Sequence, residues 1–284
     1  MAGPSMTSPR HRGLPVGTTR RRLRVHNADR SYLLHLPRGY TGAGPLPVVV
    51  TFHGFGANGR AQLALSDFAA VADRNGFLVV APESRGPGWD FLRPPSRTGS
   101  DAAFVVALLD DLRSVVRVDP HRIYATGISN GAAVVFALAC ANVGGFAAYG
   151  AVAGAFYSPL CDRAPPQPIV YFHGTADRLV PIGGGRVFGV AVAPAEQTVA
   201  RWAAHNGCGA EPRRSLIASD VTLLTFQGGR GSADVHYYVI AGGGHCWPGA
   251  PPGIGRVTDR FLGHTTGSIS ASQIMWDFFA RRSR

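Results

Sequence analysis

The sequence predicts an α/β fold in one domain, with a mainly parallel central sheet, helices on both faces and an antiparallel strand pair at the N-terminal end. Apolar segments of strand length alternate with longer segments of helical period, which is typical of a parallel sheet joined by helical crossovers. Most of these short segments are continuously apolar, as expected for strands buried on both faces. The 284 residues, 45% of them hydrophobic, can bury one large core, and no internal repeat or long linker divides them.

The predicted elements follow in chain order. Strands at residues 21–26 and 31–37 flank a turn at 27–30 and form the antiparallel pair. The remaining strands are expected at residues 47–52, 77–81, 122–126, 146–153, 168–173, 221–226 and 235–240. Helices are expected near residues 61–74, 102–118, 132–141, 193–206 and 270–280. Residues 1–17, rich in Pro, Gly, Ser and Arg, are expected to form a disordered basic arm, with a single folded domain spanning 18–284.

The charge of the chain does not indicate a nucleic-acid partner. The formal net charge is +11, but all 28 basic residues are arginines and many lie near the two ends. This pattern favours a compositional bias over selection for phosphate binding. No apolar run approaches the length that spans a bilayer, so no membrane partner is expected. The N-terminus lacks the apolar core of an export signal, which predicts either an intracellular protein or a chain without its signal.

The four cysteines are Cys140, Cys161, Cys208 and Cys246, and none forms a C-x-x-C motif. A zinc site is therefore not expected, and the sequence predicts neither a metal nor another cofactor. Three complete disulfide pairings are possible. We favour Cys140–Cys161 with Cys208–Cys246, partly because of where these segments fall in the predicted fold. The alternative is four small buried thiols.

The strongest functional motif is G-x-S-x-G at residues 127–131. An apolar strand precedes it and a helix rich in small residues follows it. This order is typical of a nucleophile elbow, in which Ser129 occupies a sharp turn above the sheet. Glycine is required on both sides because a Cβ there would collide with neighbouring strands. The pattern predicts Ser129 as a nucleophile.

A serine nucleophile needs a base and a third group that orients the base. Functional residues of open α/β sheets gather at the carboxyl ends of the strands. Asp177 follows strand 168–173 in this position, and His245 follows strand 235–240 after a run of glycines. The order Ser129, Asp177, His245 is that of α/β-hydrolases, which makes this the predicted fold. His53 and His173 each precede a glycine and are expected to hydrogen-bond the backbone instead.

Two further features complete the predicted site. The backbone N–H groups of Asn130 and Phe55 are expected to form an oxyanion hole, since Asn130 follows the nucleophile and Phe55 lies in the glycine-rich loop 53–56. Trp89 and Trp247 are expected near the cleft, where their rings would bind an aryl acyl group or a polyester chain. The alternative is that these rings only cover the edge of the sheet.

Four motifs, taken together, resemble the polyhydroxybutyrate depolymerase/feruloyl esterase-like family of α/β-hydrolases. They lie at residues 53–56, 127–131, 173–177 and 243–249, and the resemblance extends from about residue 21 to 279. It implies Ser129 as nucleophile, Asp177 as acid and His245 as base, and for many members it implies secretion.

The resemblance also bears on the cysteines. Residues 204–208 are similar to the family's cysteine-bearing helix end, but Gln227–Gly229 stands where the usual partner lies. This difference makes Cys246 the substitute candidate.

The sequence thus predicts a serine carboxylic ester hydrolase. The expected substrates are soluble aryl or hydroxyalkanoate esters, oligomers or amorphous polyester, because no separate polymer-binding module is recognisable. Two alternatives stay open: an acyltransferase that uses the same three residues, and a non-catalytic binding protein with a degenerate site.

Overall fold

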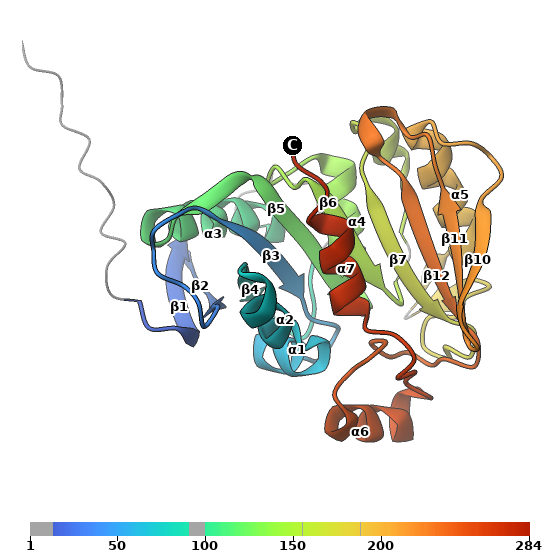
Figure 1. Cartoon of the computed structure of the whole chain (residues 1–284), viewed down its shortest axis with the longest axis horizontal. Helices are drawn as coiled ribbons and strands as arrows, with labels where there is room; N and C mark the ends of the chain where they lie inside the picture. The colour runs from blue at the N-terminus through green and yellow to red at the C-terminus, as the bar shows by residue number, and fades with distance from the viewer. Residues whose placement is uncertain (1–13, 91–99, 155, 188) are drawn as a thin grey trace, which may run out of the picture.

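The computed structural model of the protein describes residues 14–90, 100–154, 156–187 and 189–284. Ten strands form one sheet, in the order β1, β2, β4, β3, β5, β6, β7, β12, β11, β10 (Figure 1). From β4 to β12 each strand runs parallel to its neighbour, whereas the strands at both edges pair antiparallel. The predicted α/β-hydrolase fold, with its antiparallel N-terminal pair, is confirmed.

The bounds of the elements follow. The strands of the large sheet are β1 (Gly17–Val25), β2 (Ala28–Leu36), β3 (Leu46–Phe52), β4 (Leu78–Pro82), β5 (Val118–Ile128), β6 (Ala148–Val152), β7 (Ile169–Gly174), β10 (Arg213–Ala218), β11 (Val221–Phe226) and β12 (Val235–Ile240). A separate hairpin consists of β8 (Gly185–Val187) and β9 (Val190–Val192). The helices are α1 (Gly59–Ser66), α2 (Phe68–Asn75), α3 (Asp101–Val115), α4 (Asn130–Ala141), α5 (Ala195–Asn206), α6 (Pro252–Leu262) and α7 (Ala271–Phe279), with 3-10 turns η1 (Pro159–Arg163) and η2 (Arg230–Ser232).

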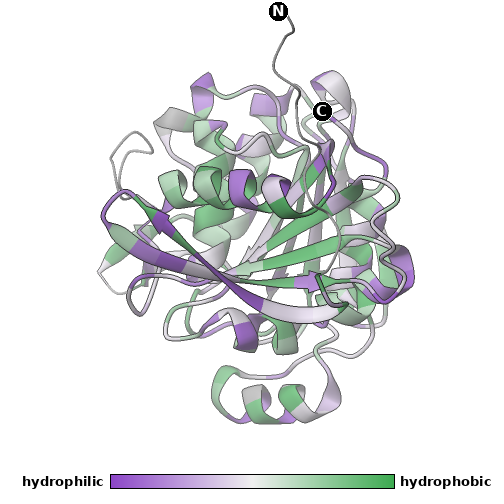
Figure 2. Cartoon of the chain, turned by 90° about the vertical axis from the view of Figure 1, so that its left-hand side faces the viewer, coloured by the Kyte–Doolittle hydropathy of each residue, from purple (hydrophilic) through white to green (hydrophobic). Residues whose placement is uncertain are grey.

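Two apolar cores lie on opposite faces of the sheet. One contains buried side chains of α3, α4 and α5, including Phe104 and Trp202. The other contains those of α1, α2 and α7, including Phe68 and Met275. The central strands are apolar and lie between the helices (Figure 2). Because successive side chains of a strand point to opposite faces, continuously apolar strands can supply both cores.

Some elements differ from the sequence prediction. The first turn has two residues rather than four, because Val25 already pairs with Ala28. The predicted helix 61–74 is two helices, since Asp67 adopts a left-handed conformation with φ 53° and ends α1. The edge strand β10, the β8–β9 hairpin and α6 were not predicted. Residues 1–13 of the predicted arm lie outside the described residues, and Gly17 already belongs to β1.

The disulfide prediction is half right. Cys140, at the end of α4, forms a disulfide with Cys161 of η1. The predicted Cys208–Cys246 bridge is wrong, and both residues remain thiols. The Cys208 thiol faces the carbonyl of Ala233, before β12 begins, whereas Cys246 follows the far end of that strand. A six-residue strand spans roughly 20 Å, far more than a disulfide can bridge.

No helix within the described ranges is long and apolar enough to cross a membrane.

The cysteine arrangement is testable by intact mass. Unfolding and alkylation without reductant should modify two thiols per chain, those of Cys208 and Cys246, because Cys140 and Cys161 are already joined. Alkylation after reduction should modify all four. Finding four modified thiols without reductant would contradict the Cys140–Cys161 bridge, and finding none would restore the second pair.

Candidate active site

Ser129 occupies the sharp turn between β5 and α4. Its backbone angles are φ 59° and ψ −121°, which few non-glycine residues adopt. Its N–H donates a hydrogen bond of 2.9 Å to the carbonyl of Val152, at the end of the neighbouring strand β6. The turn is therefore fixed from the side. This is the geometry that the G-x-S-x-G motif predicts for a nucleophile elbow.

The two glycines of the motif are required by their surroundings. A Cβ on Gly131 would lie 2.3 Å from the carbonyl oxygen of Phe52, at the end of β3, and one on Gly127 would lie 2.7 Å from the Gly131 backbone. Both distances are shorter than side chains tolerate. A Cβ on Gly54 would lie 3.5 Å from the Cβ of Ser129, so the loop after β3 runs directly beside the serine. The elbow leaves no room for larger residues.

Asp177 and His245 come together as the sequence predicts. The Nδ1 of His245 lies 2.8 Å from Oδ2 of Asp177, and both residues are buried. The other carboxylate oxygen of Asp177 accepts the N–H groups of Leu179 and Val180, each at 2.9 Å. The backbone N–H of His245 donates to the carbonyl of Leu262. The acid and the imidazole are therefore both held in place.

The loops that carry these two residues are packed backbone to backbone. A Cβ on Gly174 would lie 2.2 Å from the carbonyl oxygen of Gly243, and the N–H of Ala176 donates to that same oxygen at 2.8 Å. The glycines after β12 therefore allow the His245 loop to lie against the Asp177 loop. This packing explains why a glycine run precedes His245.

His173 supports the acid from its other side. Its Nε2 donates to the carbonyl of Val180 at 2.8 Å and lies 3.3 Å from Oδ2 of Asp177, while its Nδ1 accepts the hydroxyl of Tyr171. His53 likewise binds backbone, through the carbonyl of Gly54 and the N–H of Ser84. Burial lowers the pKa of His53. The prediction that both histidines fix loops is confirmed.

The electrostatics of Asp177 favour a permanent negative charge. Burial alone would raise the pKa of this carboxyl group. Hydrogen bonds from His173, His245 and the Val180 amide outweigh burial and hold the pKa well below its ordinary value. The carboxylate is therefore charged in the folded protein near neutral pH. Its negative charge can stabilise positive charge on the His245 ring.

Ser129 lies at the same edge of the sheet as this pair. Strands β5, β6, β7 and β12 are consecutive neighbours, and Ser129, Asp177 and His245 follow the carboxyl ends of β5, β7 and β12. Within the described residues, no hydrogen bond joins the Ser129 hydroxyl to His245, whose Nδ1 binds Asp177. Catalytic hydrogen bonds are often long without substrate and shorten in the substrate complex. The structure thus joins acid and imidazole directly and places the serine at their edge.

The two nominated oxyanion donors lie on either side of the elbow. Asn130 is the first residue of α4, and the first N–H groups of a helix have no acceptor inside the helix. Phe55 belongs to the loop that runs beside Ser129. Its side chain is 58% exposed, and its ring packs where a Cβ on Gly88 would lie 2.7 Å away. Phe55 is thus an exposed aromatic residue next to the elbow, whereas the sequence predicts only its amide as part of the site.

The two tryptophans expected to bind substrate are buried. Trp89 is 5% exposed, and its indole N–H donates to the carbonyl of His53 at 2.9 Å. Trp247 is fully buried, donates to the hydroxyl of Ser272 and packs edge-on against Phe68. Protein atoms occupy the surroundings of both rings. The structure therefore gives them packing and hydrogen-bonding roles, and the alternative that they cover the sheet is the better description.

The site contains no evident place for a metal ion. No group of three or more His, Cys, Asp or Glu side chains in the part of the chain that the structure describes could hold one.

Comparison with known proteins finds a family match over part of the chain. Residues 30–162 match the family described as esterase PHB depolymerase. The matched segment contains the loop 53–56 and the elbow, but it ends before Asp177 and His245. The assignment of those two residues therefore depends on the structure rather than on this match.

Individual relatives point the same way. The chain is 27% identical to NocK of Nocardia uniformis subsp. tsuyamanensis, over 86% of this chain and 79% of NocK. It is 28% identical to feruloyl esterase B of Piromyces equi, over 76% of this chain but only 42% of that enzyme. Among solved structures, acetyl xylan esterase from Aspergillus awamori has a TM-score of 0.62 at 16% identity, covering 85% of this chain and 98% of that chain.

The fold and these matches define a carboxylic ester hydrolase of the α/β-hydrolase class. The predicted resemblance to the polyhydroxybutyrate depolymerase/feruloyl esterase-like family is confirmed.

The charge of Asp177 predicts a pH-dependent contribution to stability. Because its folded pKa is depressed, the carboxylate stabilises the fold above the ordinary carboxyl pKa of about 4, and this contribution is lost as the pH falls toward the depressed value. Asp177→Asn should therefore lower the free energy of unfolding in urea more at pH 6 than at pH 3. Asp110→Asn, at an exposed site, should show no such difference. An equal effect of Asp177→Asn at both pH values would contradict the depressed pKa.

The close packing of the elbow predicts that Gly131→Ala is strongly destabilising. The new Cβ would meet two carbonyl oxygens, of Phe52 and His53, that belong to the backbone and cannot move alone. We expect a loss of more than about 2 kcal/mol in the free energy of unfolding. Gly209→Ala is the matched control, since open space surrounds that position, and it should change stability by less than about 0.5 kcal/mol. Equal stabilities of the two variants would show that the elbow is not closely packed.

Proposed function

We propose that the protein hydrolyses carboxylic esters through an acyl-enzyme on Ser129, with His245 as base and Asp177 as the acid that orients it. One observation carries the proposal. A serine on a strained elbow lies at the sheet edge where a buried carboxylate holds an imidazole at 2.8 Å. This combination activates a hydroxyl group for attack on a carbonyl carbon.

The hydrogen bond between Asp177 and His245 sets the protonation of the ring. A carboxylate can only accept, so Nδ1 of His245 carries the proton and Nε2 is left with its lone pair. Nε2 then takes the proton of the Ser129 hydroxyl as the oxygen attacks the ester carbonyl. The negative charge of Asp177 stabilises the imidazolium that forms.

The remaining steps follow from the same groups. The imidazolium gives its proton to the departing alcohol, which leaves the acyl group bound to Ser129. Water then attacks the acyl-enzyme while His245 accepts a proton from it, and His245 returns that proton to the Ser129 oxygen as the bond to the acyl group breaks and the carboxylic acid departs. The N–H groups of Asn130 and Phe55 are proposed to stabilise the oxyanion in both steps. The hydrogen bond between Ser129 and His245 is expected to form when substrate binds.

The proposed substrates are soluble aryl or hydroxyalkanoate esters, oligomers or amorphous polyester. Two matches support this range, since residues 30–162 match the esterase PHB depolymerase family and a relative is named feruloyl esterase B. The exposed ring of Phe55, beside the elbow, is the aromatic surface proposed to contact the acyl group. The Cys140–Cys161 disulfide favours an oxidising compartment, such as the outside of the cell.

Ser129→Ala tests the proposed nucleophile. The variant should stay folded by circular dichroism, since it removes one hydroxyl oxygen, and should lose at least about three orders of magnitude in kcat toward p-nitrophenyl esters. Wild-type rates in the folded variant would refute the proposal and leave a non-catalytic role for the site.

Product analysis with and without an added alcohol separates hydrolysis from acyl transfer. The free acid should be the main product in both cases if water is the natural acceptor. A predominant new ester in the presence of moderate alcohol would favour the acyltransferase alternative instead.

A further inference from the structure

The two proposed oxyanion donors belong to separate segments of the chain. Asn130 begins α4 after strand β5, whereas Phe55 lies in the loop after β3. Stabilisation of an oxyanion requires both N–H groups to point at one place, and small displacements weaken it. Some other part of the molecule must therefore hold the two segments at a set distance.

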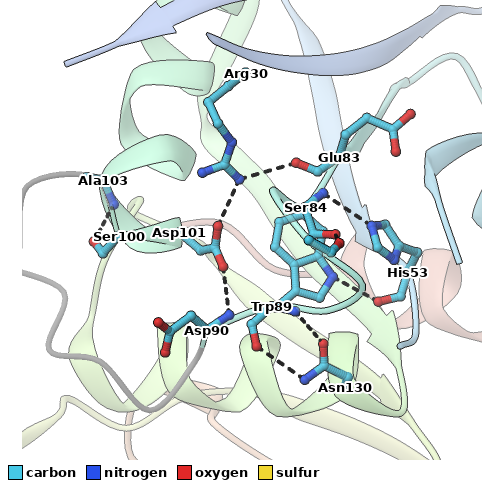
Figure 3. A network of polar contacts seen from close by, with 11 residues as sticks. Arg30, His53, Glu83, Ser84, Trp89, Asp90, Ser100, Asp101, Ala103 and Asn130 are labelled. Carbon is cyan, nitrogen blue, oxygen red and sulfur yellow. Dashed lines mark hydrogen bonds and ion pairs between the residues drawn. The ribbon is translucent and has the colours of Figure 1, made fainter. Parts of the chain in front are cut away.

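Trp89 contacts both segments (Figure 3). Its indole N–H donates to the carbonyl of His53 at 2.9 Å, two residues before Phe55. Its backbone N–H donates to Oδ1 of Asn130 at 2.6 Å, and Nδ2 of Asn130 donates back to the Trp89 carbonyl at 3.4 Å. One buried residue is thus hydrogen-bonded to the loop that carries one donor and to the residue that carries the other.

The packing around Trp89 supports the same role. Its ring lies edge-on to the ring of Phe52, with centroids 5.3 Å apart. The centroid of the His53 ring lies 4.9 Å from that of Trp89. The preceding residue, Gly88, fits so closely that a Cβ would lie 2.7 Å from the Phe55 ring and 2.9 Å from Oδ1 of Asn130. The backbone at 88–89 therefore fills the space between the two donor segments.

A buried ion pair, Arg30–Asp101, is hydrogen-bonded to Asp90, the residue after Trp89. The N–H of Asp90 donates to Oδ2 of Asp101 at 2.7 Å, and the other oxygen of Asp101 accepts Arg30 at 2.8 Å (Figure 3). Arg30 also donates to the carbonyl of Glu83, which begins the segment that leads to Trp89. Its guanidinium lies 3.8 Å from the centroid of the Phe104 ring. Both charges are buried, so they hold this geometry strongly when paired.

We propose that Trp89 is a positioning residue that sets the distance between the two halves of the oxyanion hole, and that the Arg30–Asp101 pair fixes Trp89 in place. Trp89 does not touch the reacting atoms in this account. It acts on the amide of Asn130 through the side chain of that residue, and on the amide of Phe55 through the carbonyl of His53. The inference rests on the proposed function, since it assumes that these amides receive the negative charge of the reaction.

Trp89→Phe is the most direct test, because it keeps an aromatic ring and removes the indole N–H that binds His53. The matched control is Trp202→Phe. Trp202 is also buried, and its indole N–H also donates to a backbone carbonyl, that of Phe156 at 3.1 Å, but it lies on α5. Both variants lose one hydrogen bond from an indole N–H to a backbone carbonyl, and only one of those bonds adjoins the proposed oxyanion hole.

The expected kinetic result is specific. Trp89→Phe should lower kcat toward p-nitrophenyl acetate by about tenfold or more while KM changes less than about twofold, since a donor that acts only in the transition state is displaced. The inhibition constant of a trifluoromethyl ketone, which forms a tetrahedral oxyanion on the serine, should rise by a similar factor. Trp202→Phe should keep kcat within about twofold of the wild-type value.

Asn130→Ala provides a second variant if Trp89→Phe fails to fold. It keeps the backbone N–H of residue 130 and removes the oxygen that accepts the Trp89 N–H. It should lower kcat in the same direction, and the double variant should lose less than the sum of the two single losses.

Three results would overturn the inference: wild-type kcat in the folded Trp89 or Asn130 variant, an equal loss in the Trp202 control, or an unchanged inhibition constant. Ser129→Ala is measured alongside. If that variant stays active, the proposed function fails. If it is inactive while Trp89→Phe matches wild type, only the positioning role fails.

Discussion

The close approach between the elbow and the end of β3 is the constraint on which the rest of the site depends. The backbone of Gly131 comes so near to the Phe52 carbonyl that no side chain fits between them. Ser129, in its strained conformation, lies two residues before this contact, and the loop after β3 runs beside the serine. The proposed nucleophile and one proposed oxyanion donor are therefore neighbours through close backbone packing. Glycine is the only residue type that permits it.

The site also requires a carboxylate, that of Asp177, to remain charged although it is buried. Asp177 is almost inaccessible to water, and an unpaired carboxylate there would be costly. The fold supplies the amides of Leu179 and Val180 on one oxygen and two imidazoles on the other. The acid is thus satisfied by rigid neighbours before any substrate arrives. In the proposed mechanism this fixed carboxylate orients the His245 ring and stabilises the positive charge that develops on it.

Much of the fold could be predicted because its central strands are buried on both faces. Strands β11 and β12 have the predicted bounds, and β3 differs by one residue. The predictions fail for elements whose sequences lack the apolar pattern of buried strands and helices. Strand β10 is an edge strand that starts with two exposed arginines, and α6 begins with Pro252 and contains two glycines, which disfavour helices. The break at Asp67 depends on a single left-handed residue inside an otherwise helical pattern.

The residues of the site also differ in whether the sequence alone could predict them. The position of Ser129, Asp177 and His245 at one edge of the sheet could be predicted, because each stands in a short motif at the carboxyl end of a strand. The positioning role proposed for Trp89 could not be predicted, since it depends on an ion pair between Arg30 and Asp101, which are 71 residues apart in the chain. A tryptophan in a loop rich in Gly and Pro suggests exposure, and only long-range contacts show that it is buried.

The most direct test of the central claim, that Ser129 is the nucleophile activated by His245, is covalent labelling with a fluorophosphonate followed by peptide mass mapping. We predict one adduct per chain, on the peptide that contains Ser129, and labelling that slows by at least about a hundredfold in His245→Gln. An adduct on another residue, or equal labelling rates in the two proteins, would contradict the account.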